Sequence, residues 1–192
     1  MRTAVKNLLH SVGLETAAFA SADDFLETDL ADGPNCLILD VRLPGLGGLD
    51  LQAELNRRNV HIPIIFMTAH GDIPMSVRAM KAGAVEFLTK PFRDQDLLDA
   101  IHVGLARDWA RRRQQGEMAE TRRRYESLTP RQRELLPLVI SGRSNRDVAS
   151  QFGTSEITIK VNRRNLMQKM KATSFADLFR MASELRIPYT KV

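Results

Sequence analysis

Three polar residues in the first half of the chain have side chains that together suit phosphoryl chemistry. Asp40 lies at the end of one short apolar run, Thr68 ends a second, and Lys90 directly follows a third. A carboxylate can accept a phosphoryl group, a hydroxyl can donate a hydrogen bond to its oxygens, and an ammonium can neutralise its charge. A lone aspartate at a strand end is usually a cap, but these three residue types in this order indicate a phosphoryl-transfer site.

The elements that carry these residues are predicted to be strands of one parallel sheet. The runs 35–41, 61–68 and 84–89 are short and apolar, as buried strands are, and a weaker strand is predicted at 15–20. Helical segments alternate with the strands, which predicts a doubly wound α/β domain. Ligands of such sheets bind beyond the carboxyl ends of the strands, so the three side chains should converge there.

Local signals mark the starts of two of these helices. Ser21 with Asp24 three residues later has the pattern of a capping box, and Asp72 followed by Pro74 marks a second helix start. The bond between Lys90 and the proline after it is a candidate cis peptide.

The composition is that of a soluble globular protein with one or two domains. The chain has 192 residues, of which 43% are hydrophobic and 27% are charged, so a disordered or fibrous chain is excluded. A single cysteine, Cys36, excludes an internal disulfide framework and fits a reducing compartment. No apolar run approaches the roughly 20 residues that span a bilayer. We therefore expect a cytoplasmic protein without a membrane partner.

The charge is distributed unevenly along the chain. Residues 1–105 contain 9 Lys or Arg and 14 Asp or Glu, whereas residues 106–192 contain 19 and 9. This asymmetry predicts two domains, of which the basic one binds a polyanion; a basic face that is merely solvated is the alternative. Between the halves, residues 105–126 contain two arginine triplets and few large apolar side chains. They are predicted to form a solvated helical linker.

The second half has the signals of four short helices. Helix starts are predicted at capping residues, and glycines follow the first two helices. A short helix, a glycine turn and a longer helix form the pattern of a helix-turn-helix. The four predicted capping residues are Thr129, Ser144, Ser155 and Ser174.

The third of these helices has one apolar face and one polar face. Ile159, Leu166 and Met170 fall on the apolar face, which is predicted to pack into the core. Long cationic and amide side chains around a small apolar residue, on the opposite face, suit the base edges of the major groove. The residues expected to contact DNA are Thr158, Lys160, Val161, Arg164, Asn165 and Gln168, with Arg163 and Lys169 placed for phosphates.

Two stretches of the first half resemble a two-component receiver domain: LILDVRLPGLGGLDL and IPIIFMTAHGDIPMSVRAMKAGAVEFLTKPF. The stretch AHGDIPM resembles the branch that contains FixJ, NodW and StyR. The resemblance covers about residues 1–105 and implies a flavodoxin-like fold. It makes Asp40 the phosphoacceptor, Thr68 the switch hydroxyl, Lys90 the phosphate-binding lysine and Phe87 the aromatic that reports the state. It also implies that the backbone carbonyl of Arg42, with Asp40, ligates Mg²⁺.

The chain departs from the receiver pattern at its start. Receivers begin with a strand that ends in consecutive acidic residues, which hold Mg²⁺, whereas residues 1–5 here match the helix that follows that strand. We therefore expect a receiver domain truncated at its N-terminus, with weak or absent Mg²⁺ binding. In the family's strand order, 2-1-3-4-5, the missing strand also leaves residues 15–20 two strand spacings, about 9–10 Å, from their next neighbour.

A stretch of the second half closely resembles the LuxR/NarL-type DNA-binding module: LTPRQRELLPLVISGRSNRDVASQFGTSEITIKVNRRNLMQKM. The resemblance covers about residues 124–189. It implies a four-helix fold with 157–170 as recognition helix, base-reading positions at Lys160, Val161 and Arg164, and dimerisation through 175–185. The predicted organisation is thus a receiver domain at 1–105, a helical linker at 106–123 and a helix-turn-helix domain at 124–192.

These features favour a transcriptional response regulator of the NarL/FixJ type. Phosphorylation of Asp40 by a partner histidine kinase would promote homodimerisation on DNA, and RNA polymerase is a further expected partner. A second hypothesis is a phosphorylation-independent transcription factor with a degenerate pseudo-receiver. An enzyme is not expected, because an aspartate-nucleophile phosphatase needs a second aspartate where Arg42 stands, and no G-x-S-x-G, P-loop or H-E-x-x-H motif occurs.

Overall fold

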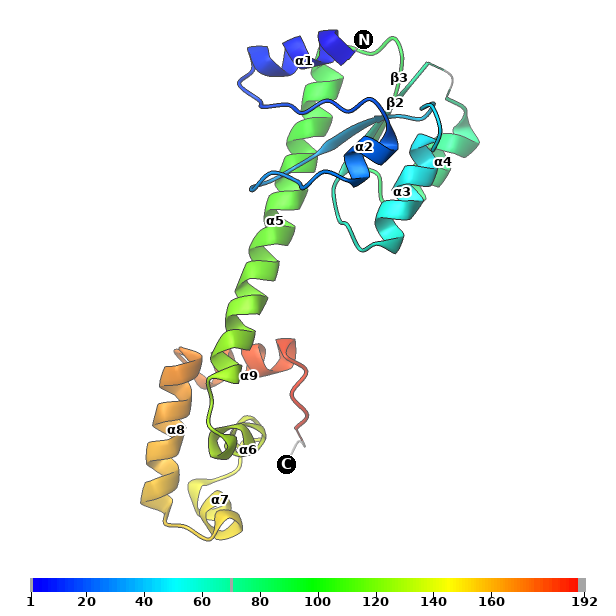
Figure 1. The fold of residues 1–192 in the computed structure, drawn as a ribbon. Helices are drawn as coiled ribbons and strands as arrows, with labels where there is room; N and C mark the ends of the chain where they lie inside the picture. The colour runs from blue at the N-terminus through cyan, green and yellow to red at the C-terminus, as the bar shows by residue number, and fades with distance from the viewer. Residues whose placement is uncertain (1, 70, 190–192) are drawn as a thin grey trace. The chain divides into compact units, whose positions relative to one another are not determined.

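The structure, a computed structural model, describes residues 2–69 and 71–189 (Figure 1). The chain divides into two compact units, residues 1–112 and residues 113–192. Helix α5, Asp94–Glu126, contains residues of both units, and it covers the whole predicted linker in helical form. The domain boundaries expected at 105 and 123 stay predictions.

A parallel sheet forms the centre of the first unit. Its strands are β1 Leu37–Asp40, β2 Ile64–Thr68 and β3 Glu86–Thr89, in the order β1-β2-β3. The three apolar runs are thus confirmed as strands, with shorter bounds than expected. All five residues of β2 are buried, because this strand has a neighbour on each side and helices on both faces.

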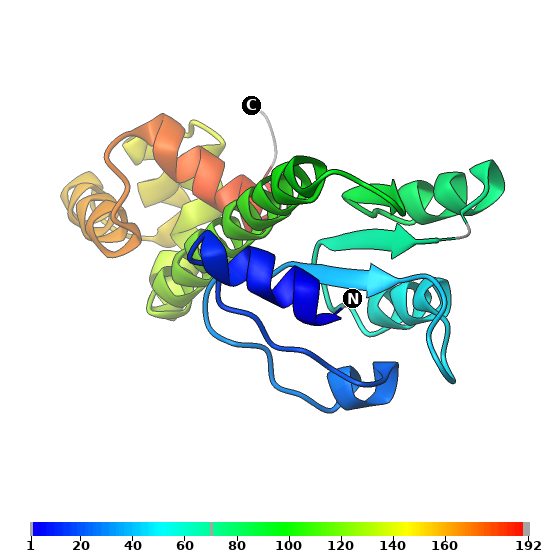
Figure 2. The same cartoon turned by 90° about the horizontal axis from the view of Figure 1, so that it is seen from above.

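Helices cover both faces of this sheet, as the strand–helix alternation predicted (Figure 2). Helix α1, Arg2–Ser11, and the first part of α5 pack on one face through Leu9, Leu97 and Ile101. The other face is covered by α2, Ala22–Leu26, α3, Gly48–Arg57, and α4, Ile73–Lys81. Their apolar side chains meet the sheet at Phe66, which is fully buried.

The prediction of a weaker strand at 15–20 is wrong. These residues have no strand structure, and the described sheet contains only the three strands above. A strand is held by hydrogen bonds to a neighbouring strand, and the predicted position, two strand spacings away, offers none. Phe19 nevertheless packs against Phe25 of α2, with ring centroids 5.3 Å apart.

The predicted helix starts in this unit are confirmed. The hydroxyl of Ser21 accepts a hydrogen bond from the backbone N–H of Asp24, whose carboxylate accepts from the N–H of Ser21, so the capping box is complete. The carboxylate of Asp72 caps α4 by accepting from the N–H of Met75 at 2.7 Å. The peptide bond between Lys90 and the next proline is cis, as expected.

After α5, the described residues of the second unit form four helices around a core of their own. Its helices are α6 Pro130–Ile140, α7 Asn145–Phe152, α8 Glu156–Met170 and α9 Phe175–Glu184. All four predicted capping residues accept a hydrogen bond from the backbone of the first helical turn. The core side chains come from all four helices and include Leu136, Val148, Leu166 and Leu178, each fully buried.

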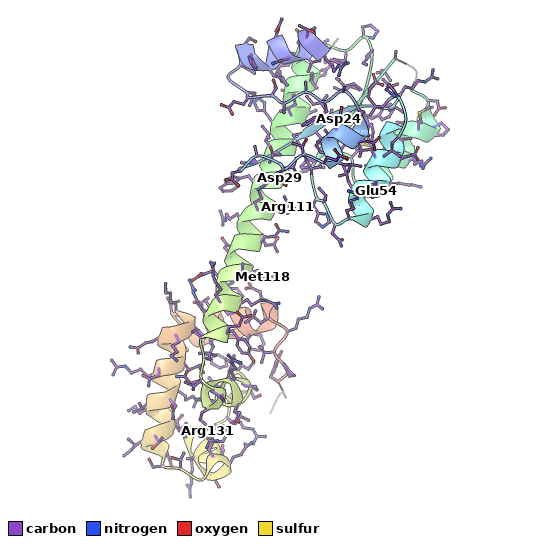
Figure 3. All side chains as sticks on the ribbon, viewed as in Figure 1. Asp24, Asp29, Glu54, Arg111, Met118 and Arg131 are labelled. Atoms are coloured by element: carbon purple, nitrogen blue, oxygen red, sulfur yellow. The ribbon has the colours of Figure 1, made fainter. Side chains whose placement is uncertain are left out.

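Arg131, labelled in Figure 3, joins the first two helices of this unit. Its guanidinium lies 3.7 Å from the centre of the Phe152 ring and donates to the Phe152 carbonyl at 2.8 Å. A cation over an aromatic face and a charge-assisted hydrogen bond both stabilise this pairing. The start of α6 is thereby fixed against the end of α7.

Candidate functional site

Asp40 and Lys90 meet at the carboxyl edge of the sheet, as the strand ends predicted. Lys90 Nζ lies 2.6 Å from Asp40 Oδ2, and the two side chains are 16% and 34% exposed. The other carboxylate oxygen, Oδ1, accepts a hydrogen bond from the backbone N–H of Arg42 at 3.1 Å. Both oxygens therefore have a donor, so the carboxylate is oriented while one side stays open to solvent.

Thr68 and Phe87 lie on the neighbouring strands of the same edge. Thr68 is 1% exposed, and its carbonyl accepts from the backbone N–H of Lys90 at 2.8 Å, which ties the lysine to the end of β2. The ring of Phe87 is half-buried, with its centroid 6.0 Å from that of Phe66. The structure therefore brings the predicted aspartate, threonine and lysine to one edge; their roles stay predictions.

Two glycines that the sequence analysis did not single out let the backbone approach this edge. A Cβ at Gly48 would lie 2.3 Å from the carbonyl oxygen of Asp40, so α3 can start directly against the end of β1 only without a side chain there. A Cβ at Gly71 would lie 2.7 Å from the Phe87 ring and 2.9 Å from the Thr68 methyl. The signal was present in the glycine-rich stretch after Asp40 and in the single glycine that follows Thr68 by three residues.

The described residues around Asp40 include no cluster of metal-binding side chains. Within the described ranges, no group of three or more His, Cys, Asp or Glu side chains could hold a metal ion. Mg²⁺ needs oxygen ligands in near-octahedral geometry, usually with one or two carboxylates. One oxygen of Asp40 is already paired with Lys90, and the carboxylate of Asp24 caps α2. The predicted ligand role of the Arg42 carbonyl stays a prediction.

Asp108 of α5 forms a buried ion-pair cluster near the other end of β1, which the sequence analysis missed. Its side chain is 1% exposed and accepts from the backbone N–H of Asn35 at 2.9 Å and from Arg112 Nε at 2.7 Å. Arg111 pairs with its other oxygen. Burial alone would raise the pKa of Asp108, but the hydrogen bonds from Asn35, Arg111 and Arg112 outweigh it and hold the pKa below its ordinary value.

Cys36, beside this cluster, is a structural thiol. Burial, with a smaller contribution from the charge of Asp108, raises the pKa of Cys36 to about 12. A Cβ at Gly104 of α5 would lie 2.6 Å from the Cys36 sulfur, so helix and strand are closely packed here. A thiol with such a pKa stays protonated and unreactive near neutral pH.

The predicted DNA-contacting face of α8 is exposed. Ile159, Leu166 and Met170 are buried in the core of the second unit, as the helical pattern predicted. The opposite face carries no large buried side chain and is open over the length of the helix. Exposed side chains on it are Thr158, Lys160, Val161, Arg164, Asn165, Gln168 and Lys169.

Arg163 and Lys169, expected at phosphates, make contacts within the second unit. The guanidinium of Arg163 donates to the side chain of Asn145 and to the carbonyl of Arg143, the latter at 3.2 Å. Burial lowers the pKa of Arg163 below its ordinary value. Lys169 Nζ donates to the carbonyl of Ser127 at 3.2 Å. Arg163 thus fixes α8 to the turn before α7, and its predicted phosphate contact stays a prediction.

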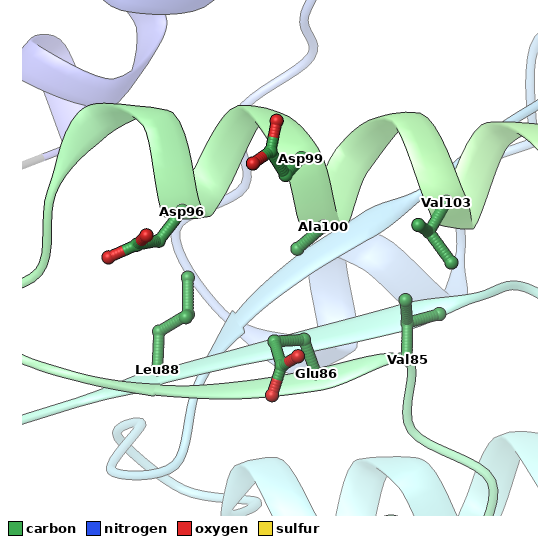
Figure 4. A pocket seen from close by; sticks show the side chains of 7 residues that line it. All are labelled: Val85, Glu86, Leu88, Asp96, Asp99, Ala100 and Val103. Carbon is green, nitrogen blue, oxygen red and sulfur yellow. The ribbon is translucent and has the colours of Figure 1, made fainter.

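A pocket of about 350 Å³ lies between β3 and α5, away from Asp40 (Figure 4). Three carboxylates line it, and each accepts a hydrogen bond: Glu86 from the N–H of Phe87, Asp96 from Arg93, and Asp99 from Gln95. None of the predicted site residues lines this pocket. The phosphoryl-transfer edge and the face of α8 therefore remain the two candidate sites.

Comparison with known families assigns each unit. Residues 1–102 match the response regulator receiver domain, and residues 126–182 match the bacterial regulatory proteins of the luxR family. The chain belongs to the response regulator family. This response regulator combines a receiver domain with a LuxR-type DNA-binding domain, which confirms the predicted fold class and the prediction of a two-component transcriptional regulator.

The response regulator is similar to curated and solved proteins over most of its length. Nodulation protein W of Bradyrhizobium diazoefficiens is 54% identical over 187 residues, which cover 97% of this chain and 82% of that protein. The response regulator protein TodT of Pseudomonas putida is 44% identical over 183 residues, which cover 95% of this chain and 81% of TodT. The solved structure of the response regulator StyR is 44% identical in sequence and has a TM-score of 0.86. The match covers 96% of this chain and 93% of the StyR chain. Among the described residues, no helix is long and apolar enough to cross a membrane.

Proposed function

We propose that phosphorylation of Asp40 by a sensor histidine kinase switches this response regulator to tight DNA binding. The contact that supports this proposal is the ion pair between Asp40 and Lys90, beside the buried Thr68. A carboxylate oxygen of Asp40 attacks the phosphorus of a phosphohistidine, the P–N bond breaks, and an acyl phosphate forms while the histidine leaves. Lys90 then neutralises the added charge, and the hydroxyl of Thr68 donates to a phosphoryl oxygen.

The second unit delivers the output. Its α8 enters the major groove, and Lys160, Val161 and Arg164 contact base edges. Two copies bind as a homodimer through α9, on half-sites about one helical turn apart. Phe175, at the start of α9, is 50% exposed, and a dimer contact would cover it. RNA polymerase is the further partner, and the chain acts in the cytoplasm without catalysing a reaction of its own.

Receiver domains generally bind Mg²⁺ when they are phosphorylated, whereas the described residues contain no group of three or more His, Cys, Asp or Glu side chains that could hold a metal ion. This disagreement supports a second proposal, a transcription factor whose DNA binding does not depend on phosphorylation. In that case Lys90 would hold Asp40 permanently, as a structural ion pair. The two proposals differ in one measurable quantity, the effect of a phosphoryl donor on DNA affinity.

The test uses the full chain and duplex sites selected by it from a random DNA library. Affinity for a selected site is measured with and without acetyl phosphate, for the wild type and for Asp40→Asn. The switch predicts a gain of affinity in the wild type that Asp40→Asn lacks. Asp50→Asn, at an exposed carboxylate of α3, is the control and should respond as the wild type does. Equal affinity under all conditions would favour the phosphorylation-independent factor.

A further inference from the structure

The recognition helix α8 exposes a large apolar side chain that none of the predicted DNA contacts includes. Ile157, in its first turn, is 76% exposed, and Val161, one turn later, is 53% exposed. Of the large apolar residues described in the second unit, Ile157 is the most exposed. The helix is otherwise polar on its outer face. Ile157 is not part of the hydrophobic core of its own unit.

Ile157 and Val161 lie on the side of α8 that points away from the core of the second unit. At about 100° per residue, the buried Ile159, Leu166 and Met170 define the direction of the core. The opposite direction falls between Ile157 and Val161, about 20° from each. Ile157 and Val161, here called the ridge, therefore lie on the outermost line of the first turns of α8, and Gln168 lies on the same line two turns further on. A surface that the start of α8 enters meets the ridge first.

The side chains around the ridge indicate what that surface is. Lys160 and Arg164 flank it, both exposed, so the ridge is apolar along its centre and cationic at its side. A negatively charged partner with small apolar features fits this pattern. In the major groove, the C5 methyl group of thymine is the apolar feature among hydrogen-bonding base edges. The rise between Ile157 and Val161, about 6 Å, is close to two base steps of about 3.4 Å.

We propose that Ile157 and Val161 read thymine methyl groups and that Ile157 is a specificity-determining residue of this regulator. The inference rests on the proposed DNA binding by α8 and adds the base that the ridge selects. The target site then carries thymines two steps apart on the strand that faces the start of α8. Lys160 and Arg164 contact base edges beside the ridge, and the ridge adds selection for thymine.

The experiment removes single methyl groups from the DNA. The full chain selects sites from a random duplex library, and in one strong site each thymine is replaced in turn by uracil, which lacks only the C5 methyl. Wild-type affinity should fall about fourfold at the positions the ridge contacts, the value expected for loss of one buried methyl group. At one of these positions, Ile157→Ala should bind the thymine and uracil forms of the site with equal affinity. At another of them, Val161→Ala should do the same.

A matched control is available in the receiver unit. Ile73, at the start of α4, is 79% exposed, so Ile73→Ala removes the same apolar group from an equally exposed position. Ile73→Ala should keep the wild-type ratio of thymine to uracil affinity. All three substituted side chains, Ile157, Val161 and Ile73, are exposed. Unchanged melting temperatures confirm that the variants are folded.

Two results would overturn the inference. If no thymine-to-uracil replacement weakens wild-type binding, or if Ile157→Ala keeps the full wild-type sensitivity at every position, the ridge does not read methyl groups. Selective binding would persist in either case, so the proposed function would stand. If the chain selects no sequence from the library, the proposed sequence-specific DNA binding by α8 is wrong, and the inference about Ile157 is wrong as well.

Discussion

Neighbouring arginines on α8 have different environments, and this difference is testable. The guanidinium of Arg163 is held by Asn145 and by the carbonyl of Arg143, whereas the side chain of Arg164 is exposed on the outer face. Arg163→Ala should lower the stability of the second unit by about 1–2 kcal/mol, because charge-assisted hydrogen bonds are lost. Arg164→Ala should leave stability unchanged and weaken binding to a selected site by about 1–3 kcal/mol.

Thermal unfolding and binding titrations over a range of salt concentrations measure both effects. If Arg163→Ala leaves the melting temperature unchanged but lowers the salt dependence by about one charge, Arg163 contacts a phosphate, as the sequence analysis expected. Equal loss of affinity by Arg164→Ala on all DNA sequences would make Arg164 the phosphate contact instead.

Residues at strand ends could be predicted from sequence, and residues in long-range contacts could not. Asp40, Thr68 and Lys90 follow apolar runs, and parallel strands bring such ends to one edge. The contact between Asp108 and Asn35 joins residues 73 positions apart, and no local pattern announces it. The same holds for the contacts of Arg163 with Asn145 and with the Arg143 carbonyl, which join residues 18 and 20 positions apart.

At the scale of elements, Asp108 ties α5 to the segment that leads into β1. Asp108→Asn should lower the stability of the first unit by about 1–3 kcal/mol at neutral pH, because Arg111 and Arg112 lose a buried anionic partner. The folded pKa of Asp108 is lowered, so its contribution is complete above the ordinary value of about 3.9 and is lost as the pH falls through the folded pKa. The difference between wild type and variant should therefore shrink in acid.

Hydrogen exchange of the strand amides and of the Asn35 amide gives the free energy of unfolding at each pH. Asp99→Asn, at an exposed carboxylate of the same helix, should change stability by less than about 0.5 kcal/mol. A wild-type advantage that stays constant down to acidic pH would show that the charge of Asp108 does not stabilise the fold.

The linker segment was predicted to be helical from its composition, and α5 confirms this. Gly116 is its weak position, since glycine costs about 1 kcal/mol relative to alanine inside a helix. A Cβ there would meet no atom within 4 Å, so Gly116→Ala should stabilise the helix and slow amide exchange across 107–124. Ala119→Gly, at a second exposed position, should speed it. Exchange at the rate of an unstructured chain in the wild type would argue against a stable helix.

Helices were easier to predict than the sheet. Capping residues such as Ser21 and Ser144 act within four residues, so the sequence shows them directly. The segment 15–20 has the apolar content of a strand, but a strand depends on a partner that the sequence pattern alone does not provide. The strand predicted at 15–20 was therefore wrong because the segment has no neighbouring strand to pair with.

At the scale of the whole molecule, an acidic receiver and a basic DNA-binding domain divide sensing and output. We propose that Asp40 of the receiver accepts the phosphoryl group. Within the described ranges, the side chains near Asp40 provide no metal-binding group, and β1 lies at an edge of the sheet. One fixed cation, Lys90, pairs with the carboxylate. We therefore expect this 192-residue chain to be labelled weakly.

The most direct test is labelling with radioactive acetyl phosphate in the presence of Mg²⁺. Three proteins are compared: the 192-residue chain, the same chain extended at its N-terminus by a strand that ends in two acidic residues, and the extended chain with Asp40→Asn. We expect weak labelling of the first, stronger labelling of the second that depends on Mg²⁺, and none of the third. Label that persists in Asp40→Asn would contradict the assignment of Asp40, and equal Mg²⁺-dependent labelling of the first two would contradict the description of its surroundings.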